Sequence, residues 1–432
     1  MSPAEFRSGS QRQTAYAAVE TAWRVEWPKL VATLTRLVGN IDLAEDLAQD
    51  ALLAAVEQWP RDGIPPRPGA WLTVTARHRA IDRIRRDQNL AAKYALLGQE
   101  LLADDAGVGS ATDAAPAIED DLLRMIFTAC HPVLSPAAQI ALTLRLVGGL
   151  TTEEIARAYV VPTSTIAQRI VRAKRTITER QIPFSVPSGA ELEERLDSVL
   201  DVICLIFTEG YEATAGDEWL RIDLAEEGLR LARLLAAMMP DQAEAHALAA
   251  LLELQASRLG ARSTPDSPLV LLDDQDRSRW DQLLIRRGFL ALHRAQAINK
   301  QYDNPPGRYA LQAAIAAEHA IARIPENTNW ERLARLYAVL NHRFPSPVVQ
   351  LNRAVAVGRA QGPDAGLALV DEIARTGRLD DYHLLPAVRA DLLANLGRFG
   401  EASAEFDRAA TMTANTRERE MLLERAGRCR RH

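Results

Sequence analysis

The sequence is poor in aromatic residues and cysteine, and it has no long apolar run. Aromatic side chains make up 5% of the 432 residues, and the three cysteines, Cys130, Cys204 and Cys429, are far apart and form no CxxC pair. This spacing excludes a disulfide framework and a cysteine zinc site and fits a reducing cytoplasm. No apolar run is long enough to cross a bilayer, and the polar N-terminus, Met1 to Tyr16, has no signal-peptide core. We therefore expect a cytoplasmic protein with no membrane partner.

Motifs that carry catalysis are also missing. The chain has no GxSxG, P-loop, GxGxxG or HExxH sequence. Cys130 and His131 lack a second pair of metal ligands nearby, so a structural role is the better interpretation. The acidic residues of the 273–281 segment could bind a cation, but they lack the glycine and bidentate glutamate of an EF-hand. We expect them instead to cap a helix and pair with Arg277 and Arg279. The sequence predicts no catalysis by this chain alone, no metal site and no cofactor.

The residues that are abundant favour helices. Ala, Leu, Arg and Glu dominate, and hydrophobic residues reach 47%, so the chain can bury sizeable cores. Its length indicates two to four domains. We expect an all-α protein. The expected divisions are residues 14–97, a first helical domain; 98–118, a flexible linker; 119–180, a second helical domain; and 190–432, a C-terminal helical domain.

Local signals refine these divisions. In the first domain, Asn40 to Asp42 separates two helices, and Asp42 with Glu45 resembles a capping box. Four prolines and two glycines predict a loop over Trp59 to Gly69, followed by a helix from about Ala70 to Leu97. A further break, rich in proline and serine, covers residues 182–189.

The C-terminal part contains a weak internal repeat. Ala354 and Ala390 occupy matching places in two similar stretches 36 residues apart, and Ala365 and Ala402 begin the helices that follow them. The period is close to the ~34 residues of tetratricopeptide repeats. We interpret this part as a tetratricopeptide-like helical repeat; the alternative is a generic bundle of helical hairpins.

Basic residues are clustered, although the formal net charge is −6. Residues 77–93 hold six basic and two acidic side chains, and residues 169–180 hold five basic and one acidic. Nucleic acid is bound by local basic patches, so this clustering matters more than the total charge.

The strongest local signal is a helix-turn-helix over residues 150–175. Thr151 and Glu154 form a capping box, Val160 to Pro162 ends the first short helix, and Thr163 or Ser164 is expected to cap the second. Ile166, Ile170, Ala173 and Ile177 form one apolar stripe, which leaves a polar, basic front that can enter a major groove. The residues that we expect on or beside this DNA-facing side are Thr163, Ser164, Thr165, Gln168, Arg169, Arg172, Lys174 and Arg175.

Three segments in order resemble a known family. Residues 41–56 resemble region 2.2 of the sigma-70 family of RNA polymerase sigma factors, residues 70–86 resemble regions 2.3 and 2.4, and residues 119–180 resemble region 4. The absence of recognisable regions 1.1 and 3 is typical of the extracytoplasmic-function (ECF) group. Three tail segments, 201–211, 273–281 and 352–357, are similar to a subgroup with a fused tetratricopeptide-like C-terminal domain.

The resemblance implies partners and site residues. It implies binding to core RNA polymerase (its β′ and β subunits) and to promoter DNA, with the tail as a regulator or a platform for a protein or ligand partner. The implied polymerase-binding residues form an acidic helix face: Asp42, Glu45, Asp46, Gln49 and Asp50. The implied minus-ten residues are Arg67, Trp71, Arg79, Arg83 and Arg86. The arginines at 79, 83 and 86 lie opposite Val74, Ile81 and Ile84, and the proline-rich loop is expected to take a flipped base. Trp71 is better interpreted as a core residue that anchors the loop.

A different class of protein also fits the helix-turn-helix. A one-component transcription regulator would bind duplex DNA by itself and sense through the helical repeats. The acidic helix distinguishes the sigma factor from the one-component regulator, because only a sigma factor would use it to bind polymerase. A pure interaction scaffold, a third class, would leave both basic faces without a role.

Overall fold

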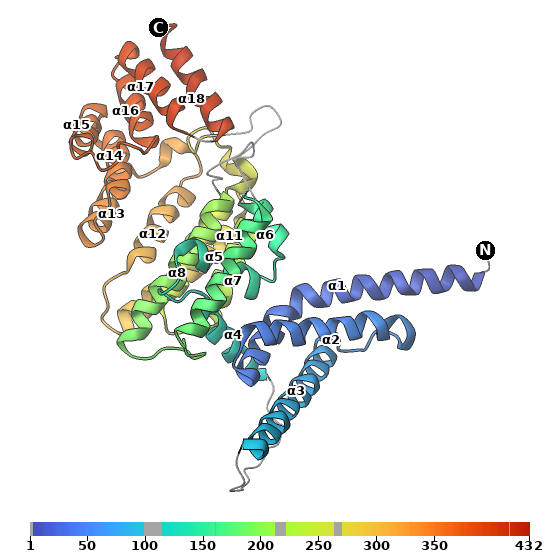
Figure 1. Cartoon of the computed structure of the whole chain (residues 1–432). Coiled ribbons are helices and arrows are strands. Elements are labelled where there is room, and N and C mark those ends of the chain that lie inside the picture. The colour runs from blue at the N-terminus through green and yellow to red at the C-terminus, as the bar shows by residue number, and fades with distance from the viewer. Residues whose placement is uncertain (1–2, 99–114, 160, 212–221, 263–269, 414) are drawn as a thin grey trace. The chain divides into compact units, whose positions relative to one another are not determined.

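The computed structural model describes residues 3–98, 115–159, 161–211, 222–262, 270–413 and 415–432. These residues form α-helices and three short 3-10 helices with no β-strand, so the predicted all-α class is confirmed (Figure 1). The chain divides into two compact units, residues 1–202 and 203–432. None of the described helices combines the length and apolar character needed to span a bilayer.

The first unit contains seven helices and the start of an eighth. They are α1 (Pro3–Val38), α2 (Ile41–Asp62), α3 (Pro68–Gly98), α4 (Ala115–Ala129), α5 (Pro136–Leu146), α6 (Thr152–Ala158), α7 (Thr163–Glu179) and α8 (Ala190–Tyr211). The break between α1 and α2 lies where the sequence predicts it, and Gly39 takes a positive φ of 67° there. The predicted capping box of Asp42 and Glu45 is wrong: Asn40 is the N-cap, and its side chain accepts a hydrogen bond from the Leu43 amide.

The proline-rich segment is less of a loop than its composition suggests. α2 continues through Pro60 to Asp62 and ends at Gly63, whose φ of 89° only glycine adopts easily. α3 already begins at Pro68, since proline suits the first turn of a helix. The expectation of a loop over Trp59 to Gly69 is therefore wrong at both ends, and only residues 63–67 lie outside the helices.

The core of the first unit forms where α1 packs against α2, α3 and α4. Trp27 and Leu34 of α1 are fully buried, and Ala44, Ala48 and Ala51 give α2 a smooth buried face. Arg36 of α1 donates a 2.9 Å hydrogen bond to the buried Asp121 of α4. Helices from both sides of the expected linker are thus joined in one unit. Most of that linker, residues 99–114, lies outside the described residues, and its last residues, 115–118, begin α4.

The first turns of α8 belong to the first unit. Arg195 donates to the Phe127 carbonyl at 2.8 Å, and the Ser198 hydroxyl donates to the Cys130 carbonyl at 2.7 Å. The division between the units at residues 202 and 203 therefore falls within this helix, C-terminal to the expected domain start at Ala190.

The second unit consists of consecutive helices. Its α-helices after α8 are α9 (Ile222–Met238), α10 (Ala243–Ala256), α11 (Gln282–Gln301), α12 (Arg308–Ile321), α13 (Trp330–Arg343), α14 (Pro347–Gln361), α15 (Pro363–Arg375), α16 (Leu384–Asn395), α17 (Phe399–Met412) and α18 (Thr416–Cys429). The 3-10 helices are η1 (Leu259–Ala261), η2 (Arg277–Arg279) and η3 (Pro325–Asn327). The sequence has proline- or glycine-containing segments at residues 239–241, 303–307, 345–347 and 362–364, and each of them separates two helices.

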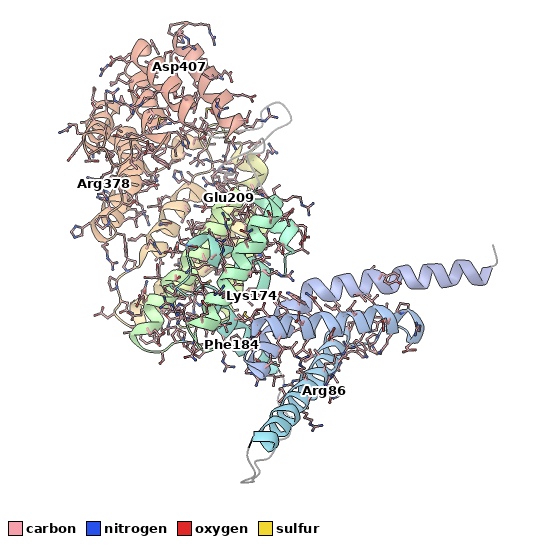
Figure 2. All side chains as sticks on the ribbon, viewed as in Figure 1. Arg86, Lys174, Phe184, Glu209, Arg378 and Asp407 are labelled. Atoms are coloured by element: carbon pink, nitrogen blue, oxygen red, sulfur yellow. The ribbon has the colours of Figure 1, made fainter. Side chains whose placement is uncertain are left out.

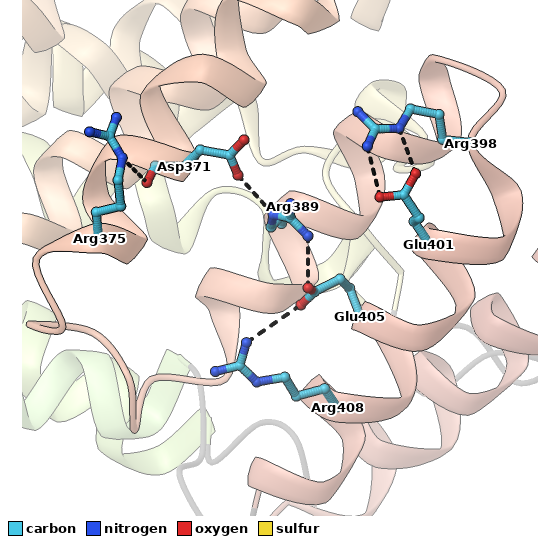
Figure 3. Close-up of polar contacts among 7 residues, drawn as sticks. All are labelled: Asp371, Arg375, Arg389, Arg398, Glu401, Glu405 and Arg408. Carbon is cyan, nitrogen blue, oxygen red and sulfur yellow. Dashed lines mark hydrogen bonds and ion pairs between the residues drawn. The ribbon is translucent and has the colours of Figure 1, made fainter.

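The last helices share one apolar core that contains the two matching alanines of the suggested repeat. Ala354 of α14 and Ala390 of α16 are both fully buried in one core, which α15, α17 and α18 complete. Arg389 of α16 bridges Asp371 of α15 and Glu405 of α17 at 2.9 and 2.8 Å (Figure 3). One cation thus joins three successive helices.

His319 of α12 makes the stability of the second unit sensitive to pH. Burial, with the positive charges of Arg258 and Arg277, lowers the pKa of His319 to about 3. The unfolded chain takes up a proton as the pH falls through about 6.5, whereas the folded chain does so only near 3. The contribution of neutral His319 to the free energy of unfolding is therefore complete above pH 6.5 and is lost as the pH falls toward 3.

We expect this loss to reach about 2 kcal/mol at pH 5. Between pH 7.5 and 5, the free energy of unfolding of the unmodified protein should fall by about 2 kcal/mol more than that of His319→Gln, as measured by urea denaturation. His293→Gln, at an exposed position of α11, should behave as the unmodified protein. An unchanged pH dependence in His319→Gln would contradict the assignment.

Candidate nucleic-acid and polymerase interface

The helix-turn-helix is formed by α6 and α7. The Thr151 hydroxyl accepts from the Glu154 amide, and the Glu154 carboxylate accepts from the Thr151 amide, which confirms the capping box. α7 begins at Thr163, and its N-cap is Pro162 without a side-chain hydrogen bond, so the expected cap at Thr163 or Ser164 is wrong. The apolar stripe of α7 is confirmed: Ile166, Ile170, Ala173 and Ile177 are its buried residues.

The opposite face of α7 is largely free to meet a ligand. The exposed members of the predicted set are Thr163, Ser164, Gln168, Arg172 and Arg175, and the partly buried ones are Thr165, Arg169 and Lys174. Val171, which is not among the predicted residues, is 64% exposed between Gln168 and Arg172. Helical spacing alone places it there, since it follows Gln168 by three residues. An apolar group at this place can contact a thymine methyl.

The acidic face of α2 divides into exposed and buried members. Asp42, Asp46, Gln49 and Asp50 are exposed, whereas Glu45 is only 4% exposed. Four of the five predicted polymerase-binding residues are therefore accessible to polymerase without a rearrangement of the chain.

Glu45 is held by two cations of the helix-turn-helix part. Arg145 of α5 donates to Glu45 at 3.0 Å and lies 5.3 Å from the centre of the Trp27 ring. Lys174 of α7 pairs with Glu45 and donates to Asp42 at 2.8 Å. Burial lowers the pKa of Lys174, but Glu45 and Asp42 outweigh it and leave the pKa raised. A residue predicted to hold DNA and two predicted to hold polymerase are thus bonded to one another (Figure 2 labels Lys174).

The buried pair predicts a measurable stability difference. Arg145 and Glu45 side chains are 14% and 6% exposed, so Arg145→Ala leaves a buried carboxylate with Lys174 alone. We expect Arg145→Ala to lower the free energy of unfolding by about 2–4 kcal/mol. Arg175, paired with Glu179 on the surface at 75% and 57% exposure, is the matched control and should show no measurable loss on change to Ala. Equal urea midpoints for the two variants would refute the role of Arg145.

α3 carries the predicted minus-ten residues except Arg67, which directly precedes the helix. Arg67, Arg83 and Arg86 are exposed, and Arg79 is partly buried near Asp50 at 3.8 Å. Arg86 lies well along α3 (Figure 2), where its guanidinium donates to the Asp82 carbonyl. Trp71 is half-buried edge-on to the buried Trp59, with 5.7 Å between ring centres, as expected of a loop anchor.

The apolar side of α3 differs from the expected one. Leu72, Ala76 and Ala80 are buried, whereas Val74 and Ile81 are 52% and 41% exposed. The helix meets α1 and α2 along a narrow strip that suits alanine, so the branched residues remain outside. They add exposed apolar surface on the side of α3 opposite the arginines, outside the predicted site.

The other clusters considered from sequence have structural roles. The Cys130 thiol contacts the Thr143 hydroxyl at 3.3 Å, and burial raises the pKa of Cys130 to about 12. The His131 ring accepts from the Val133 amide. Within the described ranges, no group of three or more acidic, histidine or cysteine side chains is placed to hold a metal ion.

The acidic 273–281 segment does cap helices. Asp276 accepts from the Ser278 amide at the start of η2, and Asp281 caps α11. The expected pairing of this segment with Arg277 is wrong: Asp273 pairs with Arg359, and Arg277 donates to the His319 and Ala322 carbonyls, because η2 turns it toward α12.

Comparison with known proteins follows the same division of the chain. Residues 26–90 match Sigma-70 region 2, residues 124–177 match Sigma-70 region 4, and residues 195–296 match a Family of unknown function (DUF6596). The chain is 41% identical over 395 residues to an uncharacterized protein of Rhizobium meliloti (strain 1021), covering 90% of this chain and 91% of that protein. No solved structure matches.

A second relative is a probable sigma factor. The chain is 31% identical over 175 residues to the probable ECF RNA polymerase sigma factor SigI of two Mycobacterium tuberculosis strains, CDC 1551 / Oshkosh and ATCC 25618 / H37Rv. The match covers 39% of this chain and 57% of SigI. The two Sigma-70 regions and the similarity to SigI place the chain among transcription initiation factors. The chain belongs to the sigma-70 family, as a member of its ECF group with an additional C-terminal domain.

Proposed function

We propose that this sigma factor binds core RNA polymerase through the exposed acids of α2 and reads the minus-thirty-five element with α7. The single observation that supports it best is the α7 geometry: one face is buried as an apolar stripe, and the other presents Gln168 and Arg172 to solvent. Gln and Arg are side chains that pair with base edges in the major groove. We place this activity in the cytoplasm, with the polymerase.

The minus-ten element is proposed to lie along α3. Arg79, Arg83 and Arg86 follow one side of the helix and suit the phosphates of a separated strand. The loop of residues 63–67 is the proposed place for a flipped base.

Binding in this manner requires opening of the first unit. Lys174 is bonded to Asp42 and Glu45, so the two DNA-binding parts are joined through the polymerase-binding helix. To engage two promoter elements at once, the chain must exchange these ion pairs for contacts with polymerase and DNA. The C-terminal unit is proposed to regulate this step.

In vitro transcription with core polymerase tests the proposal, on templates that carry random upstream DNA. Specific transcripts that depend on the added protein are the expected result. A chain ending at Tyr211 keeps the contacts of Arg195 and Ser198 and reports on the C-terminal unit. Higher activity of this shorter chain would mark the unit as inhibitory, and lower activity would mark it as required, provided that polymerase binding is retained. Equal activity of both chains would contradict regulation by this unit.

The one-component regulator is the second candidate, because the same α7 face could serve a protein that acts on duplex DNA alone. Tight sequence-specific binding to duplex DNA without polymerase, and no transcripts from either chain, would favour it over the sigma factor.

A further inference from the structure

Arginine and aromatic side chains alternate at one place in the second unit. Arg262 lies 3.8 Å from the centre of the Tyr211 ring, and Arg258 lies 5.5 Å from Tyr211 and 5.7 Å from the Trp280 ring. Arg277 lies 5.2 Å from the centre of the Trp280 ring. The five residues come from the end of α8, the end of α10, η1 and η2, all within the part that matches a family of unknown function.

The cluster contains buried hydrogen-bond donors without acceptors. The Tyr211 hydroxyl, the Trp280 indole nitrogen and Nε of Arg277 are buried with no partner in the part of the chain that the structure describes. These residues are only 5%, 3% and 6% exposed. Buried donors are nearly always paired, and each one left unpaired destabilises the fold. Three such donors around one pair of rings indicate an acceptor that the described residues do not supply.

The positive charges of Arg277 and Arg258 are also poorly neutralised. The remaining nitrogens of Arg277 donate to two carbonyls and to the Thr328 hydroxyl, none of which carries charge. The Arg258 guanidinium makes no hydrogen bond or ion pair with the described residues, and the nearby Asp273 is paired with Arg359. Burial lowers the pKa of Arg277, and Arg258 lowers it further against the opposing effect of Asp273. Buried cations ordinarily have an anionic partner.

We propose that Arg258, Arg277, Tyr211 and Trp280 bind an oxyanion, the phosphate or carboxylate group of a small molecule. An oxyanion accepts hydrogen bonds from several donors at once and neutralises guanidinium groups. It would therefore pair both the free donors and the positive charges. The ligand is small, because three of these residues are buried beyond the reach of a DNA backbone or a protein surface. Arg258, the partly exposed member between the rings, is the group that a ligand meets first. This inference does not depend on the proposed function.

The first test uses the full chain and inorganic phosphate. In phosphate-free buffer at constant ionic strength, isothermal titration calorimetry is expected to show saturable binding with a dissociation constant below about 1 mM. At one hundred times that constant, the Tm should rise by roughly 5–10 °C. Succinate in place of phosphate tests whether a carboxylate source is accepted. No saturable binding of either anion, or a Tm that rises as much with sodium chloride, would overturn the proposal.

Variants locate the site. Arg258→Ala should weaken phosphate binding at least tenfold, and Arg286→Ala, at an exposed position of α11, should leave it unchanged. Tyr211→Phe removes only the hydroxyl group. Because that hydroxyl has no partner, the variant should keep its Tm without phosphate and still bind phosphate several-fold more weakly. A Tyr211→Phe protein with unchanged phosphate affinity, or equal affinities for Arg258→Ala and Arg286→Ala, would refute this site even if phosphate binds elsewhere.

Discussion

Reversing the charge of Asp46 and Asp50 together is expected to weaken binding to core polymerase roughly 100-fold or more. Both side chains are exposed on α2, one helical turn apart, and a basic or polar partner surface would then face two lysines. Like charges brought together at an interface cost several kcal/mol. Affinity for core polymerase, measured by fluorescence anisotropy with labelled protein, reports the effect directly, and transcription should fall with it.

The control for this experiment is another pair of exposed acids. Asp223→Lys with Glu226→Lys changes the net charge equally on α9, in the second unit, and should leave polymerase affinity within about twofold of the unmodified protein. Glu45→Gln is a separate comparison, since its carboxylate is buried against Arg145 and Lys174 and its loss should lower stability first. If the Asp46 and Asp50 variant binds polymerase normally, another surface of the chain carries that contact.

The sequence pattern was sufficient where a helix buries a single apolar stripe. The spacing of Ile166, Ile170, Ala173 and Ile177 fixed the orientation of α7, and Thr151 with Glu154 fixed the start of α6. Both depend on residues close in sequence, which interact through the geometry of one helix.

The sequence pattern was not sufficient where contacts with another helix determine which residues are buried or paired. Periodicity places Lys174 beside the DNA-facing side and Glu45 on the acidic side, but it cannot show that α5 and α7 approach α2 and join them. Arg145, which completes that group, is distant from Glu45 in sequence and carries no motif. On α3, the narrow strip at α1 and α2 selected alanine over valine and isoleucine, against the ranking by hydrophobicity.

Removing both Gln168 and Arg172 is expected to lower promoter-specific transcription roughly 30-fold or more while polymerase affinity stays unchanged. Both side chains are exposed on α7, and Arg172 forms no ion pair with any described residue, so their loss disturbs little of the fold. Each base or phosphate contact contributes about 1–3 kcal/mol. Gln168→Ala with Arg172→Ala should therefore lose the binding free energy of two contacts, as measured by transcription from a selected promoter.

The matched control is Arg180→Ala with Gln181→Ala, which removes the same two residue types just beyond the end of α7 and should retain transcription. Lys174→Ala separates two roles that the sequence assigned together. Since Lys174 is 12% exposed and bonded to Asp42 and Glu45, its loss should lower the Tm, whereas loss of Gln168 and Arg172 should not. If the Gln168 and Arg172 variant transcribes as well as the control, α7 does not read the promoter, and the minus-thirty-five contact must come from another surface.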